Sequence, residues 1–220
     1  YGLYVPSGRV VDRGPWRAMT GLRELARRGL AQFRLTANQN LMLADIAPAQ
    51  RDEVAALLEE YGLAAPVSRV RQLALACVGF PTCALAMAES ERYAPDFLTK
   101  VETLLATHGL ADAPIGIRIT GCPNGCARPY LAEIALVGKA PGRYNLYVGG
   151  TPDGRHLTVP LQDNVTEADI LATLDGLFAR YAAERQTAEA FGVFVRRVGI
   201  VPSIDCGRAF AAEVARLTAA

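Results

Sequence analysis

The chain has 220 residues, and because 51% of them are hydrophobic and only 20% charged, it can bury a substantial core and is not a disordered segment. The formal net charge of +1 argues against a nucleic-acid-binding protein that depends on bulk positive charge. No apolar run approaches the ~20 residues that span a bilayer, and no secretion signal opens the chain. We therefore expect a cytoplasmic globular protein with neither nucleic acid nor membrane among its partners.

The first sixty-odd residues predict the order strand, helix, strand, helix. Apolar periodicity and turn residues indicate an extended segment at 3–11, a helix at 15–30, strand segments at 33–37 and 41–43, and a helix from Pro48 to Tyr61 that Gly62 ends. This order suits a small ferredoxin-like α+β half-domain over residues 1–66. Residues 64–69, which include Pro66, form the predicted linker.

The remaining residues, 67–220, predict an α/β domain. The expected elements are an apolar strand at 73–76, helices at 84–91 and 95–109, a strand at 115–119, paired strands at 134–137 and 144–148, and a long helix from Thr166 to about residue 185. Cys77 and Cys122 both follow the end of a predicted strand. Because α/β folds place their sites beyond the ends of strands, we expect a functional site there.

Two cysteine pairs, Cys77-x5-Cys83 and Cys122-x3-Cys126, are the most informative feature of the sequence. Four thiolates from two loops are what a cubane 4Fe–4S cluster requires, one sulfur for each iron. The Gly and Pro residues around these cysteines allow tight turns, in which several sulfurs and backbone N–H groups point at one centre. The spacing therefore favours an iron–sulfur cluster bound by the four cysteines.

Three other interpretations stay open on spacing alone. Disulfides need an oxidising compartment and would leave a fifth thiol, Cys206, without a partner. A structural zinc site usually has two-residue gaps within its Cys pairs, whereas these gaps are five and three residues. Four unrelated cysteines, buried as small hydrophobes, are the third alternative. Cys206 itself is expected to be a free thiol without a ligand role.

The residues around the cysteines resemble the sirohaem and 4Fe–4S signature of assimilatory sulfite reductases. The similar segments are ACVGFPTCALAMAE at 76–89, TGCPNGC at 120–126, GKAPGRYNL at 138–146, LTANQNL at 35–41 and AFG at 190–192. The resemblance runs in order from about residue 10 to about residue 200. It implies a ferredoxin-like half-domain at 1–66, a 4Fe–4S and sirohaem-binding domain at 67–220, and reduction of sulfite to sulfide in six electrons.

The resemblance also implies roles for single residues. Cys77, Cys83, Cys122 and Cys126 would bind the cluster, and Cys126 would also be the axial ligand of the sirohaem iron, so that one sulfur bridges the two centres. Asn124 would contact the haem, although from the residues alone it equally suits a tight turn. Thr36, Asn38 and Gln39 would lie at the sirohaem as well, whereas the residues alone favour an ordinary turn. Four arginines are candidates to bind the haem carboxylates: Arg34, Arg118, Arg128 and Arg143. A solvated surface position is the alternative for each of them, and Lys139 has the same two interpretations.

The chain matches only the second half of the family's two-half haemoproteins, whose substrate-binding cations come chiefly from the first half. Tyr1, where Met would open a complete protein, also predicts a piece of a longer chain whose missing N-terminus would carry any targeting signal. The cations here look scattered, with no Arg or Lys cluster beside either cysteine pair. We therefore expect the missing N-terminal half to be a partner needed for activity on sulfite.

The sequence contains no phosphate loop or nucleotide fingerprint, so an electron donor must be a second partner. Residues 126–130 and 150–152 resemble ferredoxin-dependent enzymes, while 139–145 resemble haemoproteins that work with an NADPH-linked flavoprotein. Gly125 favours sulfite over nitrite reductases. A sirohaem nitrite reductase and a non-catalytic, metal-stabilised binding module remain the alternative functions.

Overall fold

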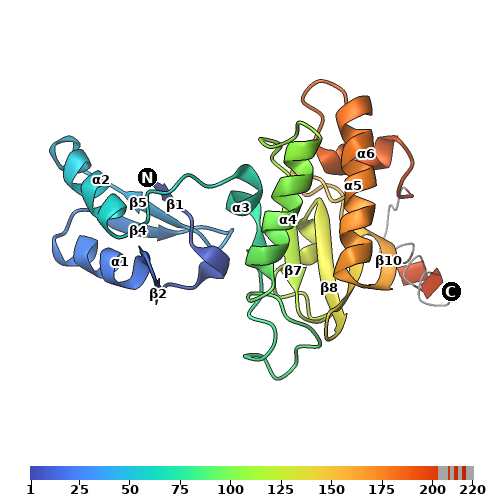
Figure 1. Cartoon of the computed structure of the whole chain (residues 1–220), viewed down its shortest axis with the longest axis horizontal. Coiled ribbons are helices and arrows are strands. Elements are labelled where there is room, and N and C mark those ends of the chain that lie inside the picture. Colours follow the sequence, from blue (N-terminus) through green and yellow to red (C-terminus); the bar gives the residue numbers. More distant parts are fainter. Residues whose placement is uncertain (203–207, 209–210, 213–214, 217–220) are drawn as a thin grey trace. The chain divides into compact units, whose positions relative to one another are not determined.

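The computed structural model describes residues 1–202, 208, 211, 212, 215 and 216, and it divides into two compact units, Tyr1–Val67 and Ser68–Ala220 (Figure 1). Both units combine helices with sheets, so the fold class is α+β, as predicted. The predicted thiol Cys206 lies outside the described residues. Within the described part of the chain, no helix is long and apolar enough to cross a membrane.

The first unit is a three-stranded antiparallel sheet with two main helices. The strand order is β1 (Gly2–Leu3), β5 (Leu41–Ala44), β4 (Gln32–Leu35), and the helices are α1 (Ala18–Arg27) and α2 (Arg51–Glu60). Short elements complete it: 3-10 turns at Pro6–Gly8 and Pro48–Gln50, and the β2–β3 hairpin of Asp12–Arg13 and Trp16–Arg17. That hairpin uses the first residues of the helix predicted at 15–30, so α1 begins three residues later than expected.

The core of the first unit lies between the sheet and its helices. On β5 the buried Leu41 and Leu43 alternate with exposed Met42, which is the period of a strand with one buried face. Leu25 of α1 and Leu58 of α2 are buried in the same cluster. The apolar periodicity that predicted both helices therefore corresponds to the buried side of this unit.

The second unit contains a five-stranded mixed sheet. Its order is β10 (Val159–Val165), β9 (Arg143–Val148), β8 (Ile134–Ala140), β7 (Ile117–Thr120), β6 (Leu75–Ala76). The pairs β6–β7 and β7–β8 are parallel, whereas β8–β9 and β9–β10 are antiparallel. The helical elements are α3 (Arg69–Leu73), α4 (Ala94–Thr107), a 3-10 turn at Pro129–Leu131, α5 (Glu167–Glu184) and α6 (Phe191–Arg197).

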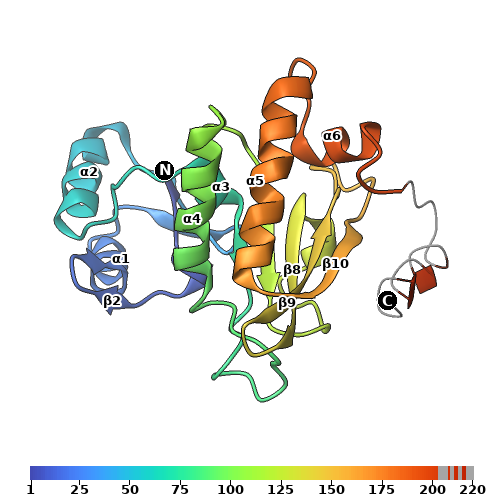
Figure 2. The same cartoon turned by 45° about the vertical axis from the view of Figure 1, so that its right-hand side comes forward.

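Helices α4 and α5 lie side by side on one face of this sheet (Figure 1; Figure 2). Ile134 and Leu136 of β8 are buried in the core beneath them, together with Phe97 of α4 and Phe178 of α5. Ala135 and Val137, which alternate with these residues along β8, pack instead in a small cluster with Tyr147 and Tyr130. Thr166 is the N-cap of α5, as predicted, and its hydroxyl forms a reciprocal capping box with the Asp169 carboxylate.

One element predicted for the second unit does not form, and one of its strands was not predicted. The helix expected at 84–91 does not form, because the N–H groups of Met87 and Ala88 donate to the carbonyl of Gly121 instead of to a preceding turn of their own segment. Strand β10 was not anticipated, because Pro160 and the polar residues 162–164 give it no clear apolar alternation. A proline and polar side chains are typical of an edge strand, which is the position of β10.

Candidate metal centre

The two cysteine pairs follow neighbouring parallel strands, as the sequence predicted. Cys77 comes directly after β6, and Cys122 lies two residues after the end of β7. Ala76 and Ile119 are register partners in the parallel pair of β6 and β7, so the segments that follow the two strands leave the sheet at the same carboxyl end. We name residues 77–90 the first cysteine loop, the teal-green segment at the lower edge of the second unit in Figure 1, and residues 121–128 the second cysteine loop.

Hydrogen bonds join the first cysteine loop to the strand ends around it. The N–H groups of Met87 and Ala88 donate to the Gly121 carbonyl over 2.8 and 3.0 Å. The Cys77 N–H donates to the Ile119 carbonyl over 3.1 Å. The same carbonyl accepts the buried Ser90 hydroxyl at 2.7 Å. These bonds hold the two loops together although about thirty to forty residues separate them in the sequence.

Three glycines make this close approach sterically feasible. A Cβ on Gly79 would lie 2.6 Å from the Ser90 nitrogen, and one on Gly121 would lie 2.7 Å from the Ala88 oxygen. Gly138 of β8 is tighter still, since its Cβ would lie 2.4 Å from the Gly121 oxygen. Any larger residue at these positions would push a cysteine loop away from the sheet.

The four cysteines differ in exposure, and all of them are free thiols. Cys122 is buried, Cys77 and Cys83 are partly buried, and Cys126 is exposed. The Cys77 sulfur accepts hydrogen bonds from the Gly121 N–H at 3.1 Å and from the Thr120 hydroxyl at 3.6 Å. The predicted disulfide alternative is therefore not realised among these four residues.

The side chains of residues 1–202 and of the further described positions form no group of three or more His, Cys, Asp or Glu that is arranged to hold a metal ion. The convergence of the four sulfurs on one centre thus stays a prediction. The donor set nevertheless fits an iron–sulfur cluster in its chemistry. It consists of four free thiols, soft ligands that such clusters use, on two loops that hydrogen bonds hold at one edge of a sheet.

Two of the arginines named as candidates for the haem carboxylates, Arg118 of β7 and Arg128 of the second cysteine loop, interact with each other. Arg118 of β7 donates from Nη1 to the Arg128 carbonyl over 2.9 Å. Burial, and then the charge of Arg128, lower the pKa of Arg118. Ten residues separate the two arginines, so spacing did not reveal their contact. This contact joins two arginines and involves no cysteine, so the expectation that no Arg or Lys cluster lies beside a cysteine pair stays a prediction.

The other predicted cations have protein partners. Arg143 donates to the Asn164 carbonyl over 3.0 Å, and Arg34 of the first unit forms an exposed ion pair with Asp45 at 3.2 Å. Lys139, near the end of β8, pairs with Asp163 at 3.4 Å. Asn124 is exposed in the second cysteine loop. None of these contacts tests a role in haem binding.

In the first unit, residues 36–40 form a hairpin turn between β4 and β5. The Thr36 N–H and hydroxyl donate to the Asn40 carbonyl over 3.0 and 3.1 Å, and the Asn40 N–H donates back to the Thr36 hydroxyl over 3.1 Å. Gln39 has a positive φ of 59°. Asn40, which was not predicted to matter, accepts the Val5 N–H through its side-chain oxygen. The segment is thus a turn, and contact of Thr36, Asn38 and Gln39 with sirohaem stays a prediction.

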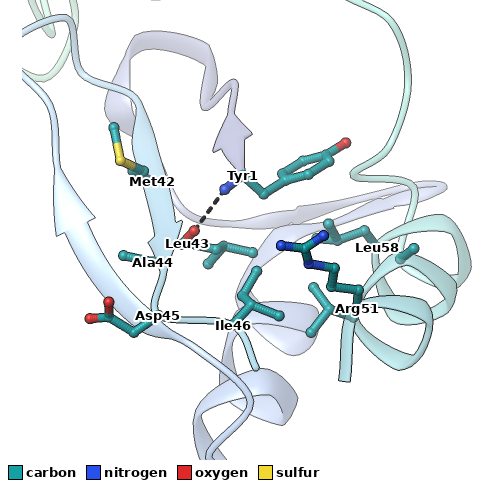
Figure 3. Close-up of a pocket in the computed structure, with 10 residues that line it drawn as sticks. Tyr1, Met42, Leu43, Ala44, Asp45, Ile46, Arg51 and Leu58 are labelled. Carbon is teal, nitrogen blue, oxygen red and sulfur yellow. Dashed lines mark hydrogen bonds between the residues drawn. The ribbon is translucent and has the colours of Figure 1, made fainter. Parts of the chain in front are cut away.

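Two surface pockets are lined by residues other than the cysteines. One, of about 550 Å³, is in the first unit between β5 and α2, where the Tyr1 amino group donates to the Leu43 carbonyl over 2.7 Å (Figure 3). Its lining is mainly apolar, with Asp45 and Arg51 as charged members (Figure 3). The other, of about 450 Å³, is in the second unit beside α6, where Arg155 and Arg197 are paired with Asp153 and Glu189. Neither pocket includes a predicted site residue.

The comparisons with known proteins identify the class. Residues 1–61 match the family described as the nitrite/sulfite reductase ferredoxin-like half domain. The chain superposes on the solved structure of the NirA protein from Mycobacterium tuberculosis with a TM-score of 0.74 and 27% identity, over 90% of this chain and 38% of that one. The chain is therefore similar to nitrite and sulfite reductases over about nine tenths of its length, which confirms the predicted resemblance.

Within that family, the similar relatives are haemoproteins. The chain is 52% identical over 210 residues to the sulfite reductase [NADPH] hemoprotein beta-component of Shewanella piezotolerans, and 55% identical over 203 residues to that of Myxococcus xanthus. These matches cover 94% and 91% of this chain but only 37% and 36% of the relatives. The chain thus spans little more than a third of the length of the proteins it resembles.

Proposed function

We propose that the protein containing this chain is an assimilatory sulfite reductase, and that this chain supplies its cluster ligands. The observation that carries the proposal is the placement of four free cysteines on two loops that hydrogen bonds join at the carboxyl edge of parallel strands. Identity above 50% to proteins named sulfite reductase hemoprotein supports the substrate. The reaction is the six-electron reduction of sulfite to sulfide.

Cys77, Cys83, Cys122 and Cys126 would hold the 4Fe–4S cluster, and Cys126 would also bind the sirohaem iron. Cys126 suits this second role because it is the exposed member of the set, so its sulfur is open to a further group. When bound, the two centres would carry electrons one at a time to the sulfur of sulfite. Metal binding and local folding are coupled, so we infer that the thiolates converge only as the cluster assembles.

The chain's other residues would bind and orient these groups. Arg118 and Arg128, the second of which follows Cys126 by two residues, carry interacting positive charges, which suits the carboxylates of sirohaem. Asn124 is exposed in the same loop and is free to donate to a haem edge. For Thr36, Asn38 and Gln39, the family resemblance supports haem contact, and the turn of residues 36–40 holds them in a defined geometry.

Two partners follow from this proposal. The missing N-terminal half would complete the protein, since the relatives are nearly three times as long as the matched region. An electron donor is also needed, and the relatives' designation as an [NADPH] hemoprotein beta-component favours an NADPH-linked flavoprotein over a ferredoxin. Free cysteines are consistent with the cytoplasm, where thiols stay reduced.

Anaerobic reconstitution followed by iron and acid-labile sulfide analysis tests the cluster. We expect about four irons and four sulfides per chain. Stoichiometric zinc without sulfide would instead identify a metal-stabilised binding module. A brown protein with sirohaem absorption bands supports the enzyme, whereas a stable colourless protein supports the module.

Activity tests the substrate and the need for the missing half. With reduced methyl viologen, the 220 residues alone should reduce sulfite negligibly, because sulfite and sirohaem are both anionic and need more cations than this chain supplies. Adding the N-terminal half should restore turnover. A higher kcat/KM for nitrite than for sulfite in the intact protein would favour the sirohaem nitrite reductase alternative.

A further inference from the structure

Cys77 differs from the other three cysteines in the donors around its sulfur. The Gly121 N–H lies 3.1 Å from Cys77 Sγ, and the Thr120 hydroxyl lies 3.6 Å from it. Among the described residues, Cys83, Cys122 and Cys126 have no donor to their sulfur atoms. The sulfur atom of Cys77, one of the four predicted ligands, is therefore already held by hydrogen bonds from the protein.

The Thr120 side chain has little choice of acceptor. It is fully buried as the last residue of β7, where Val137 of β8 is its register partner. Its one hydroxyl proton can go to Cys77 Sγ or to the Cys122 carbonyl at 3.4 Å. A thiolate is a charged acceptor, and hydrogen bonds to charged acceptors are about twice as strong as those to neutral ones. The proton therefore goes to the sulfur once Cys77 is deprotonated for metal binding.

We propose that Thr120 is a positioning residue that, together with the Gly121 N–H, holds the Cys77 sulfur and raises the reduction potential of the cluster. This inference rests on the proposed function, because it needs a cluster on Cys77. Hydrogen bonds to a ligating sulfur withdraw electron density from it and so favour the reduced, more negative cluster. Thr120 thus acts on the cluster only through Cys77, and its hydroxyl makes the cluster easier to reduce.

The test compares reduction potentials of the reconstituted intact protein, followed by EPR during a redox titration. Thr120→Val keeps the shape of the side chain and removes the donor, while Thr120→Ser keeps the donor. Thr158→Val is a matched control, because Thr158 is also fully buried in the second unit and its hydroxyl has no hydrogen-bond partner. We expect a more negative potential for Thr120→Val and a wild-type potential for both other variants.

A Thr120→Val protein that holds a full cluster at the wild-type potential would overturn the inference, and so would an equal shift in Thr158→Val. If Thr120→Val assembles no cluster, pulsed EPR on the wild type in deuterated water decides. The Gly121 amide contributes one exchangeable deuteron near the Cys77 sulfur. A second exchangeable deuteron coupled to the reduced cluster, present in the wild type and in Thr120→Ser, supports the inference, and its absence from the wild type contradicts it. A wild type without iron and sulfide would mean that the proposed function itself has failed.

Discussion

The turn of the first unit and the cysteine loops of the second are closed in different ways. Thr36 and Asn40 close their turn with bonds between residues four apart. The first cysteine loop is closed by hydrogen bonds to the carbonyls of Gly121 and Ile119, about thirty to forty residues away, and by the tight contact of Gly79 with Ser90 at the other end of the loop. A local turn forms with its own segment, whereas the cysteine loops exist only when the sheet of the second unit is folded. Substitutions in the turn of residues 36–40 should therefore disturb only the structure near that turn, whereas substitutions that disturb the cysteine loops should affect the stability of the whole second unit.

The largest expected effect is loss of the cluster on removing a predicted ligand. Cys77→Ser and Cys83→Ser should lower the iron and sulfide content from about four per chain to none. Cys126→Ser should do the same and also change the absorption spectrum of the haem, because the axial sulfur is lost. Cys206→Ser is the control and should change neither. Cluster loss in Cys206→Ser with retention in Cys126→Ser would show that the ligand assignment is wrong.

Gly138→Ala should disturb the cysteine loops without touching a cysteine. Its Cβ would lie 2.4 Å from the Gly121 oxygen, a backbone atom that cannot rotate away. We expect a loss of about 1–3 kcal/mol in the free energy of unfolding, measured with urea, as for other overpacked cores. Gly176→Ala in α5 is the matched control, because nothing lies within 4 Å of its Cβ position. That change should stabilise the protein by up to ~1 kcal/mol, since Ala is the better helix former.

Glu133 connects two segments of the second unit that are far apart in the sequence, and it should make the free energy of unfolding depend on pH. Its carboxylate accepts the Gly116 N–H at 2.8 Å and the Gly192 N–H at 3.0 Å. Burial raises the pKa of Glu133 above its ordinary value of 4.5, although hydrogen bonds from backbone N–H groups oppose this. Because the folded pKa is the higher one, stability from this group is greatest below pH 4.5 and falls as the pH rises through the raised pKa.

Glu133→Gln should flatten this dependence in urea unfolding between pH 4.5 and 8. Asp12 of the first unit should change the stability with pH in the opposite direction, because its pKa is lowered. Hydrogen bonds from the Thr20 hydroxyl and N–H lower its pKa from 3.8, so its contribution is present above pH 3.8 and is lost as the pH falls. Asp12→Asn should therefore leave the profile above pH 4.5 unchanged. An unaltered profile in Glu133→Gln would contradict the assignment.

The smallest expected effect is in the turn of the first unit. Thr36→Val removes the hydroxyl that both donates to and accepts from Asn40, and it should cost about 1 kcal/mol. Amide hydrogen exchange should quicken in Leu41 and Leu43 of β5 while β7 and β8 keep their protection. Thr36→Ser retains the hydroxyl and should behave as the wild type. Equal loss of protection in both units would mean that the turn is not a local structure.

The sequence by itself determined the elements whose signals are local. Apolar periodicity predicted α4 and α5, Thr166 predicted the start of α5, and the pairing of 134–137 with 144–148 was confirmed as β8 and β9. The motifs around the cysteines were also sufficient to recognise the family, and the position of each pair after a strand was correct. These features depend on residues a few positions apart, and such short-range patterns are visible in one sequence.

Only the tertiary structure decided the features that depend on distant segments. Residues 84–91 have helix-forming composition, but the Gly121 carbonyl takes the N–H groups of Met87 and Ala88, and a helix there would lose those bonds. The approach of Thr120 to Cys77 likewise follows from the parallel pairing of β6 with β7. Propensity is a weak preference per residue, so hydrogen bonds between segments that the folded sheet brings together override it.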